Sequence, residues 1–498
     1  MIKKYMRCAD SVIIVGAIIY VILPIIVFIS GWIKPLIALP LIVLFIFAGF
    51  KLWTELRDDS IALINKDTSA FWILTTALAF IWVYFSGIGS FVYQNWDFWA
   101  RNPFFRDLAT YKWPVYYDLS TQSDVVQKIC GTEKVTLIYY FCWWLPVAGL
   151  ANVLQLGEVS RNCLLALWAA IGVFDVFYLL CRKLNKCSWK IPVCFMMFSG
   201  LDGLAELLLR GGETQFIDHI EWWAEFFQYS CNTTLIFWVF NQAIPVWILM
   251  ALFLQLKSNN NIGTLLALSF AYSPWAALGV FPIAAVASLK KGKIKSILNP
   301  ANLLIPCAML VVFGCFYLGW SGPKGNVGLL FSFNAADNWR ILFCYLIFIL
   351  VEVLVYFFIL GKYAMQKELY GIVLFELVII PLIVVHDCNF VMRGSIPALF
   401  ILYFYVISFL LDYEADKKPE WKMRYIALVA ALIIGSLTPM HEIARTVKNT
   451  MTNDDFLYDP VVSFGNVQTD DEYLIDLAKQ LSYGYNYEEN LFFKYLAK

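Results

Sequence analysis

The chain has 498 residues, of which 61% are hydrophobic and only 15% are charged. A soluble protein carries roughly 25% charged residues and about half apolar ones. This composition excludes a soluble protein and predicts an all-α polytopic membrane protein, with lipid as the solvent of most of its surface. The formal net charge is zero, so no basic surface indicates nucleic acid as a partner.

Apolar runs long enough to cross a bilayer recur along the chain. A transmembrane helix needs about 20 apolar residues. The first run is too long for a signal peptide and lacks a small-residue cleavage site, so we interpret it as a retained anchor. The sequence predicts a bundle of about 11–13 transmembrane helices. The predicted spans are Asp10–Ile29, Pro35–Trp53, Ser69–Val92, Asn162–Cys181, Lys190–Leu208, Thr234–Leu256, Asn299–Gly319, Trp339–Leu360, Leu369–His386, Ile396–Leu411 and Tyr425–Thr438.

Lysine and arginine fall in alternate loops and set the orientation. Short loops on the cytoplasmic side of a membrane are enriched in these residues. Lys3, Lys4 and Arg7 predict a cytoplasmic N-terminus, and the count of spans predicts an extracytoplasmic C-terminus. The other basic loops carry Lys51, Arg57 and Lys66; Arg182, Lys183, Lys186 and Lys190; Lys290, Lys291, Lys293 and Lys295; Lys362 and Lys367; and Lys417, Lys418, Lys422 and Arg424.

Two apolar segments conflict with this alternation if each is counted as one span. We expect Tyr139–Leu156 to lie along the outer interface as an amphipathic or re-entrant helix, because its aromatic residues suit that position. The second segment, Ile262–Leu289, has basic residues on both sides. It is interpreted as a hairpin turning at Ser273-Pro274-Trp275, whose tip faces a cavity. The alternative is one tilted helix and a less strict charge rule.

The predicted organisation has three parts. An N-terminal hairpin covers residues 1–68, a transmembrane core covers 69–438, and a short acidic extracytoplasmic tail covers 439–498. Within the core, residues 93–161 form a long outer loop with interfacial helices, and residues 209–233 form a second outer loop. The end of the tail, Leu491 to Leu496, is aromatic enough to dock on the body.

The first outer loop carries the most unusual polar pattern. Asp97 lies just beyond a predicted span, between two tryptophans, and Arg101 follows one helical turn later. A carboxylate can take a proton from an acceptor hydroxyl, and arginine can hold phosphate bidentately. The alternative is an interfacial helix that only anchors the membrane boundary. The residues of this loop predicted to bind a substrate are Arg101, Asn102, Arg106, Asp107, Lys112, Trp113 and Tyr116.

The second outer region contains Asp202, an acid inside an apolar run and a functional candidate for that reason. The alternative is a helix break at which Asp202 caps the next turn. His219 and Glu221 are potential metal ligands, but with only three histidines in the chain no ligand set emerges. The predicted substrate-binding residues here are Asp202, His219, Glu221, Trp222 and Gln228, with Asn241 and Gln242 as the polar wall of the next span.

A third region, His386–Pro397, contains Arg393 at the outer end of a predicted helix. It lies at the depth of a lipid phosphate, and the alternative is that it snorkels to ordinary headgroups. Glu352, in the middle of a span, is interpreted as a helix-packing contact.

At these residues the chain resembles the GT-C superfamily, integral-membrane glycosyltransferases that use polyprenyl-phosphate-linked sugars. It is similar to a group of bacterial membrane proteins of this architecture in four strings: Asp97…Asn102…Asp107-Leu108…Trp113-Pro114-Val115, Ser199-Gly200-Leu201-Asp202, Glu221-Trp222-Trp223…Gln228-Tyr229-Ser230…Asn232-Thr233-Thr234, and Met392-Arg393…Ser395-Ile396-Pro397-Ala398.

The resemblance implies a GT-C-like bundle in the bacterial plasma membrane, with Asp97 as the acid that activates the acceptor and Arg393 as a holder of the donor phosphate. The chain departs from the family pattern in two ways. The acidic loop follows the third span instead of the first, and no second acid lies beside Asp97, which favours transfer without a metal ion.

The leading hypothesis is a glycosyltransferase that moves a sugar from a polyprenyl-phosphate donor to an envelope glycan or lipid. Its partners are membrane lipid, the donor and the acceptor, and it needs no cofactor beyond the lipid-linked donor. A transporter or flippase of a lipid-linked glycan is the second hypothesis, although we find no internal repeat. A non-catalytic protein of envelope assembly is the third.

Overall fold

The computed structural model of the chain describes residues 2–58, 60, 61, 63–211, 219–224, 226–290, 298–320, 327–332, 338–385, 389–452, 457, 461–467 and 471–498, with side chains omitted for 2–8 and 331. Several predictions fall outside these residues. They concern the basic loop at 291–297, residues 212–218 and 225 of the second outer loop, residues 386–388, and the tail acids at 454, 455, 459 and 470.

Eight helical stretches of the described residues are long and apolar enough to cross a membrane. They confirm a mainly helical, multi-pass membrane protein and correspond to eight of the predicted spans. They lie in α1 (Ile2–Trp32), α2 (Pro35–Leu56), α7 (Glu158–Leu184), α8 and α9 (Lys190–Met197 and Asp202–Arg210), α14 to α15 (Pro300–Tyr317), α16 to α17 (Asn338–Leu360), α21 (Ile396–Asp416), and α22 with α23 (Lys422–Gly435 and Leu437–Thr452).

The prediction of continuous spans is wrong in extent at three places. Ser69–Val92 shortens to α3 (Ser69–Phe85), because the chain after it turns through Gly87 and Gly89 with positive φ. Thr234–Leu256 is broken at Val239 into α10 (Asn232–Trp238) and α11 (Phe240–Phe253). Leu369–His386 becomes α19 (Tyr370–Ile379), followed by the short strand β4 (Ile383–Val385).

The two segments that conflicted with the charge pattern contain only short helices. Tyr139–Leu156 holds η1 (Cys142–Trp144) and α6 (Leu145–Val153), together too short for a crossing. Ile262–Leu289 is two helices, α12 (Ile262–Ser269) and α13 (Pro274–Lys290), which contact each other. The predicted break is therefore present. Gly279 of α13 packs directly against the backbone of Gly394, next to Arg393.

Helix α1 is buried in the bundle. Its Tyr20 stacks on Trp168 of α7 with ring centroids 3.9 Å apart, and its hydroxyl accepts from the indole of Trp143 at 2.9 Å. Near its start, Asp10 forms a buried ion pair with Arg182, at 2.9 Å from oxygen to Nε. The N-terminal hairpin thus contributes to the core through α1, whereas α2 is mostly exposed.

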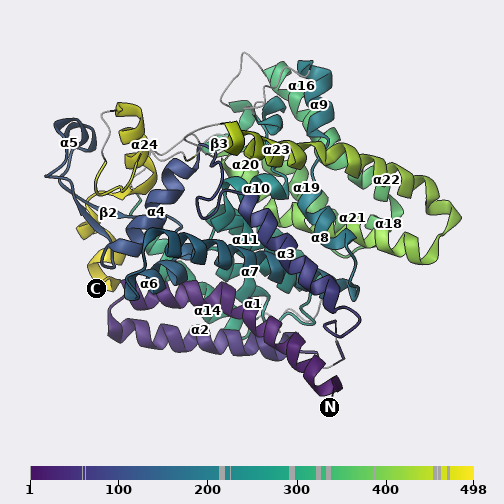
Figure 1. Cartoon of the computed structure of the whole chain (residues 1–498), viewed down its shortest axis with the longest axis horizontal. Coiled ribbons are helices and arrows are strands. Elements are labelled where there is room, and N and C mark those ends of the chain that lie inside the picture. Colours follow the sequence, from purple (N-terminus) through teal and green to yellow (C-terminus); the bar gives the residue numbers. More distant parts are fainter. Residues whose placement is uncertain are drawn as a thin grey trace.

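The long loop and the end of the chain fold together beside the C-terminal end of α1. Strands β1 (Tyr116–Asp118) and β2 (Lys134–Leu137) pair antiparallel, and β2 pairs with β5 (Tyr483–Gly484). Helix α24 (Glu472–Ser482) contacts α5 (Asp124–Cys130), as Figure 1 shows near the C-terminus. We call residues 98–153 and 461–498 together the cap.

The predicted docking of the chain end is confirmed. Phe492 is buried and its ring lies 5.1 Å from that of Phe316, and the backbone N–H of Lys498 donates to the carbonyl of Trp32 at 2.9 Å. Because α1 has 31 residues, it is roughly 46 Å long at 1.5 Å per residue. The N-terminus of the chain and the cap therefore lie at opposite ends of α1.

Helix α23 has an inverted amphipathic pattern. Its charged residues Glu442 and Arg445 are buried, whereas Leu437, Met440 and Met451 are exposed. The stretch Pro419–Thr452 has 34 residues, about 51 Å of helix, against a hydrocarbon thickness of about 30 Å. The helical stretch is interrupted after Gly435. Helix α22 has 14 residues, about 21 Å, which is too short to cross alone, and α23 presents its polar face to the protein.

Candidate functional site

Asp97 immediately precedes α4 (Phe98–Thr110), so its negative charge is stabilised by the positive end of the helix dipole. Its backbone N–H donates to the side-chain oxygen of Asn95 at 3.0 Å, and the Asn95 amide donates to the carbonyl of Phe237 at 2.7 Å. Asn95 thus holds the start of α4 against α10. The Asp97 side chain is 25% exposed, so its carboxylate is both fixed and accessible.

Arg101 lies one turn along α4 and forms an ion pair with Asp97. Its Nη2 is 3.1 Å from Oδ2 of Asp97, Nη1 donates to the hydroxyl of Tyr139 at 2.5 Å, and Nε donates to the carbonyl of Trp238 at 3.3 Å. The Arg101 side chain is only 6% exposed. Each of its nitrogens has a fixed partner, so Arg101 holds Asp97 in one orientation.

The charges of two arginines act on Tyr139. Burial raises the pKa of Tyr139, while the positive charges of Arg101 and Arg393 act in the opposite direction. Arg393 is buried on α20 (Asn389–Gly394) and donates to the carbonyl of Asn389 at 3.3 Å. Among the described residues its Nε has no hydrogen-bond partner. The charges of two sequence-predicted arginines that are far apart in the chain thus both act on Tyr139.

His219 is the centre of a second, fully buried cluster. Its Nδ1 lies 2.8 Å from Oε1 of Glu442, and its Nε2 lies 3.1 Å from Oε2 of Glu221. Burial opposes a charge on the ring, but the two carboxylates outweigh it and raise the pKa of His219 to about 10. His219 is therefore a cation at neutral pH, and both its ring nitrogens are engaged by acids. It is not placed to act as a general base.

Glu221 takes donors from its own segment as well. Its Oε1 accepts from the backbone N–H of Cys231 at 2.8 Å and from the hydroxyl of Thr234 at 2.7 Å, and its Oε2 accepts from Gln228 at 2.8 Å. Burial raises its pKa, but His219 and these hydrogen bonds prevail and lower it. His219 and Glu221 thus form a buried ion pair that is supported by these hydrogen bonds.

Glu442 and Arg445 belong to this cluster, and the sequence analysis did not single them out. Glu442 Oε2 accepts from Arg445 Nη2 at 2.6 Å and from the indole of Trp238 at 3.1 Å. A signal for both was present in the sequence as a polar stripe at helical spacing: Thr438, Glu442, Arg445, Thr446 and Asn449. Trp238 connects the two clusters, since its carbonyl also accepts from Arg101.

Asp202 lies in a different environment from Asp97. The apolar run breaks between α8 and α9, and Asp202 is the first residue of α9. It accepts from the hydroxyl of Ser199 at 2.8 Å and from the indole of Trp223 at 3.1 Å. Its carboxyl group also hydrogen-bonds to that of Glu352.

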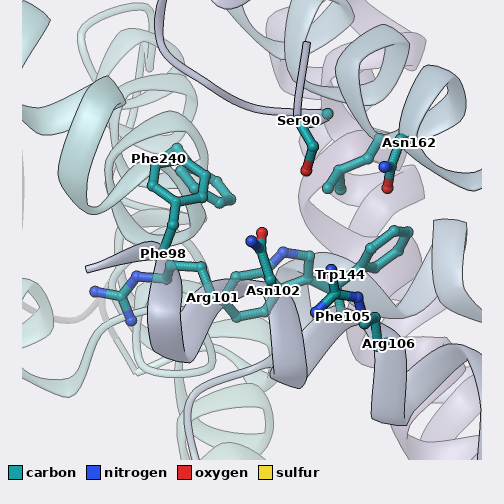
Figure 2. Close-up of a pocket in the computed structure, with 11 residues that line it drawn as sticks. Ser90, Phe98, Arg101, Asn102, Phe105, Arg106, Trp144, Asn162 and Phe240 are labelled. Atoms are coloured by element: carbon teal, nitrogen blue, oxygen red, sulfur yellow. The ribbon is translucent and has the colours of Figure 1, made fainter. Parts of the chain in front are cut away.

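Asn102 and Arg106 line a small pocket, with a volume of about 10 Å³, between α4, the start of α7, the turn after α3 and the first residue of α11. Asn102 exchanges hydrogen bonds with Gln94 and points towards Ser90, whereas the Arg101 guanidinium points away from the pocket (Figure 2). The wall contains four aromatic residues: Phe98, Phe105, Trp144 and Phe240.

The remaining predicted residues of the first loop lie within or upon the cap. Asp107 is fully buried and accepts from the hydroxyl of Tyr117 at 2.7 Å and from the backbone N–H of Phe464 at 3.0 Å. Trp113 stacks on Trp32 with ring centroids 4.9 Å apart. Tyr116 packs on Tyr487, and Lys112 is exposed.

The remaining predicted residues beyond the loop divide between surface and core. Trp222 is half-exposed, and its ring contacts His219 edge-on. Asn241 and Gln242 are fully buried at the start of α11, where Asn241 donates to the carbonyl of Tyr140 at 3.4 Å. Within the described part of the chain, neither polar atom of the Gln242 side chain has a hydrogen-bond partner.

The described residues contain no group of three or more His, Cys, Asp or Glu side chains that would hold a metal ion. Comparisons of the chain with protein families, with curated proteins and with solved structures found no match. The functional conclusion therefore rests on the class of protein, a multi-pass helical membrane protein, and on the geometry of its polar clusters.

Proposed function

We propose that the protein is a GT-C-type glycosyltransferase of the bacterial plasma membrane, acting at the extracytoplasmic face on a polyprenyl-phosphate-linked sugar. One observation carries the proposal. A partly exposed carboxylate, Asp97, is oriented by Arg101, and the same arginine shares Tyr139 with Arg393. A carboxylate that takes a proton and a guanidinium group that holds a departing phosphate are the two elements that this transfer requires.

In the proposed reaction, Asp97 removes the proton from a hydroxyl of the acceptor, a glycan or lipid of the envelope. The acceptor oxygen then forms a bond to the anomeric carbon of the sugar. The bond from that carbon to the phosphate oxygen breaks, and the electron pair leaves with the lipid phosphate. Arg393 stabilises the charge that develops on the phosphate, while Arg101 keeps Asp97 in its orientation.

The test is a transfer assay with purified full-length protein in lipid nanodiscs, using a panel of polyprenyl-phosphate sugars and envelope acceptors. We expect Asp97→Asn to reduce the rate by at least about 100-fold, the lower range for loss of a general base. Glu133→Gln, an exposed acid of the same loop, is the matched control and keeps the wild-type rate. Wild-type turnover by Asp97→Asn would remove Asp97 from the mechanism.

A transporter of a lipid-linked glycan is the second candidate, and the Asp202–Glu352 pair supports it. Carboxyl groups that share a proton inside membrane helices occur in the proton relays of transporters. This function predicts that Asp202→Asn abolishes proton-coupled movement of lipid-linked glycan between the leaflets of proteoliposomes, while Asp97→Asn leaves it intact. Loss of sugar transfer in Asp97→Asn, with transfer retained in Asp202→Asn, supports the glycosyltransferase.

A further inference from the structure

The groove between α1 and α2 is lined by residues that the proposed transfer does not use. The two helices run side by side along one edge of the molecule (Figure 1). The groove between them has a volume of about 470 Å³. Sites for small molecules enclose about 300–1,000 Å³, so this groove is large enough to hold part of a ligand of that size.

The groove is apolar along its length and open on one side. Ile22 and Phe45 are buried at its base, whereas Ile19, Ile46 and Phe50 line it and are at least half exposed. Both helices are long and apolar enough to span the membrane, so an open groove between them faces lipid chains instead of water. Its occupant is therefore expected to be a hydrocarbon chain.

The length of the groove matches one leaflet of the bilayer. It extends on α1 from Val15 to Ile26, eleven residues further on, which is roughly 16 Å at 1.5 Å per residue. The hydrocarbon region is about 30 Å thick, so one leaflet provides about half of that. An acyl chain of one leaflet fits this groove, whereas a transmembrane helix of a partner protein would need a groove of about twice the length.

One end of the groove carries a fixed tryptophan and an arginine. The indole of Trp53 lines the groove and donates to the hydroxyl of Ser11 at 3.3 Å, which joins α2 to α1. Arg57 follows one helical turn later, directly after the end of α2, and its guanidinium carbon lies 5.5 Å from the centroid of the Trp53 ring. Its side chain is exposed, and within the described part of the chain it forms no ion pair.

The described acids near this end of the helices already have partners. Asp10 is held by Arg182, Glu55 by Ser258 and Asn261, and Asp58 by Lys257. Among the described residues, Arg57 thus remains an uncompensated positive charge at the end of a spanning helix. Cations at this depth attract the anionic headgroups of lipids.

We propose that the groove between α1 and α2 binds an acyl chain of an anionic phospholipid, and that Arg57 holds the phosphate of the same molecule. The site lies at the end of α1 away from the cap, on the side that the basic residues predict to be cytoplasmic. It is independent of the proposed sugar transfer at Asp97, so neither proposal depends on the other.

The experiment measures lipid binding directly. Delipidated, purified full-length protein is titrated by native mass spectrometry with palmitoyl-oleoyl phosphatidylglycerol, palmitoyl-oleoyl phosphatidylcholine and dihexanoyl phosphatidylglycerol. We expect the first to bind about 5-fold more tightly than the second, the effect of one arginine near an anionic headgroup. The third should bind at least about 10-fold more weakly than the first, because it buries fewer methylene groups.

Each comparison can overturn one half of the proposal. Equal binding of the two long-chain lipids would overturn an anionic ligand, and equal binding of the short-chain lipid would overturn an acyl chain in the groove. A wild-type dimer that Ile46→Trp dissociates would assign the groove to a second copy of the chain and overturn the lipid.

Two variants fill the groove from opposite helices. Ile46→Trp and Ile19→Trp enlarge exposed lining residues, and each should weaken the binding of both long-chain lipids several-fold. Val43→Trp is the matched control, because Val43 is exposed on α2 outside the groove, and it should bind like the wild type. Wild-type binding by both groove variants would overturn the site.

A third variant tests the phosphate contact. Arg57→Gln should remove the preference for phosphatidylglycerol and leave the binding of phosphatidylcholine unchanged. Lys51→Gln is its control: Lys51 is also exposed on α2, but its Nζ lies over the ring of Phe47, outside the groove, so the preference should remain. A preference that persists in Arg57→Gln would overturn the role of Arg57.

Discussion

The indole nitrogen of Trp238 lies 3.1 Å from Oε2 of Glu442. Through this contact a helix near the end of the chain, α23, is tied to the residue whose carbonyl accepts from Arg101. Glu442 also neutralises His219 and Arg445, so it is the common partner of both buried cations. The orientation of Asp97 thus depends on a glutamate more than 340 residues away.

The first prediction concerns Glu442→Gln. The amide keeps the size of the side chain but removes the charge that compensates His219 and Arg445. Breaking a buried ion pair typically costs about 3–5 kcal/mol. We expect a clear fall in the melting temperature measured by intrinsic fluorescence in detergent. The exposed Glu489→Gln is the control, and an equal melting temperature for both variants would contradict the role given to Glu442.

The second prediction is a pH dependence from His219. Its folded pKa of about 10 lies above the unfolded value of about 6.5. The stabilisation is therefore fully present below pH 6.5 and is lost as the pH rises through 10. The difference in melting temperature between the wild type and His219→Gln should shrink over that range. A difference that stays constant from pH 6.5 to 10 would show that His219 is neutral in the folded protein.

The third prediction concerns Asp107, whose pKa is raised by burial, whereas the pKa of His219 is raised by neighbouring charges. Burial raises its pKa to about 6, although Tyr117 and the N–H of Phe464 act to lower it. Because the folded pKa exceeds the unfolded value of about 3.9, its contribution to stability is present below pH 3.9 and is lost as the pH rises through 6. Hydrogen exchange in residues 461–467 should accelerate between pH 4 and 7, after correction for the intrinsic rate.

Two variants check this assignment. Asp107→Asn should remove the dependence. Asp118 is exposed, and the hydroxyl of Ser120 lowers its pKa, so Asp118→Asn should leave the effect between pH 4 and 7 intact. Retention of the full effect in Asp107→Asn would assign it to another group.

The fourth prediction concerns the close contact of Gly200 with Glu352. A Cβ added to Gly200 would lie 1.8 Å from Oε2 of Glu352. The methyl group of Gly200→Ala therefore overlaps the Glu352 carboxyl group, and overpacking of this kind costs about 1–3 kcal/mol. Gly16→Ala in α1 is the control, because nothing lies within 4 Å of its Cβ position. A lower melting temperature for Gly200→Ala alone is the expected result.

Local sequence patterns placed some residues of the candidate site correctly relative to each other. Asp97 and Arg101 are four residues apart, which puts them on one helical face, and the structure joins them in an ion pair, whereas the sequence analysis assigned Arg101 to a substrate phosphate. The substrate-binding roles of Arg393 and Asp202 stay predictions. Asp202 accepts from Ser199 and Trp223, and no sequence pattern identified these partners.

The missed residues show why prediction failed there. Glu442 and Arg445 lie in the stretch that we interpreted as an acidic tail. That interpretation used only local features: the last apolar run ends just before this stretch, and charged residues follow. The stretch is a helix with a buried polar face, and that face has meaning only against His219 and Trp238. The helical periodicity of the sequence reveals the polar face of α23, but it does not identify the residues that this face contacts.

By itself, the sequence determined the membrane character, the existence of most spans and the docking of the aromatic chain end. The first two follow from hydrophobicity summed over about 20 residues. Tertiary structure alone decided where α10 and α11 break, that Arg101 pairs with Asp97, and that Glu442 balances His219. A buried charge requires a counter-charge, and which helix supplies it depends on which faces meet when the bundle packs.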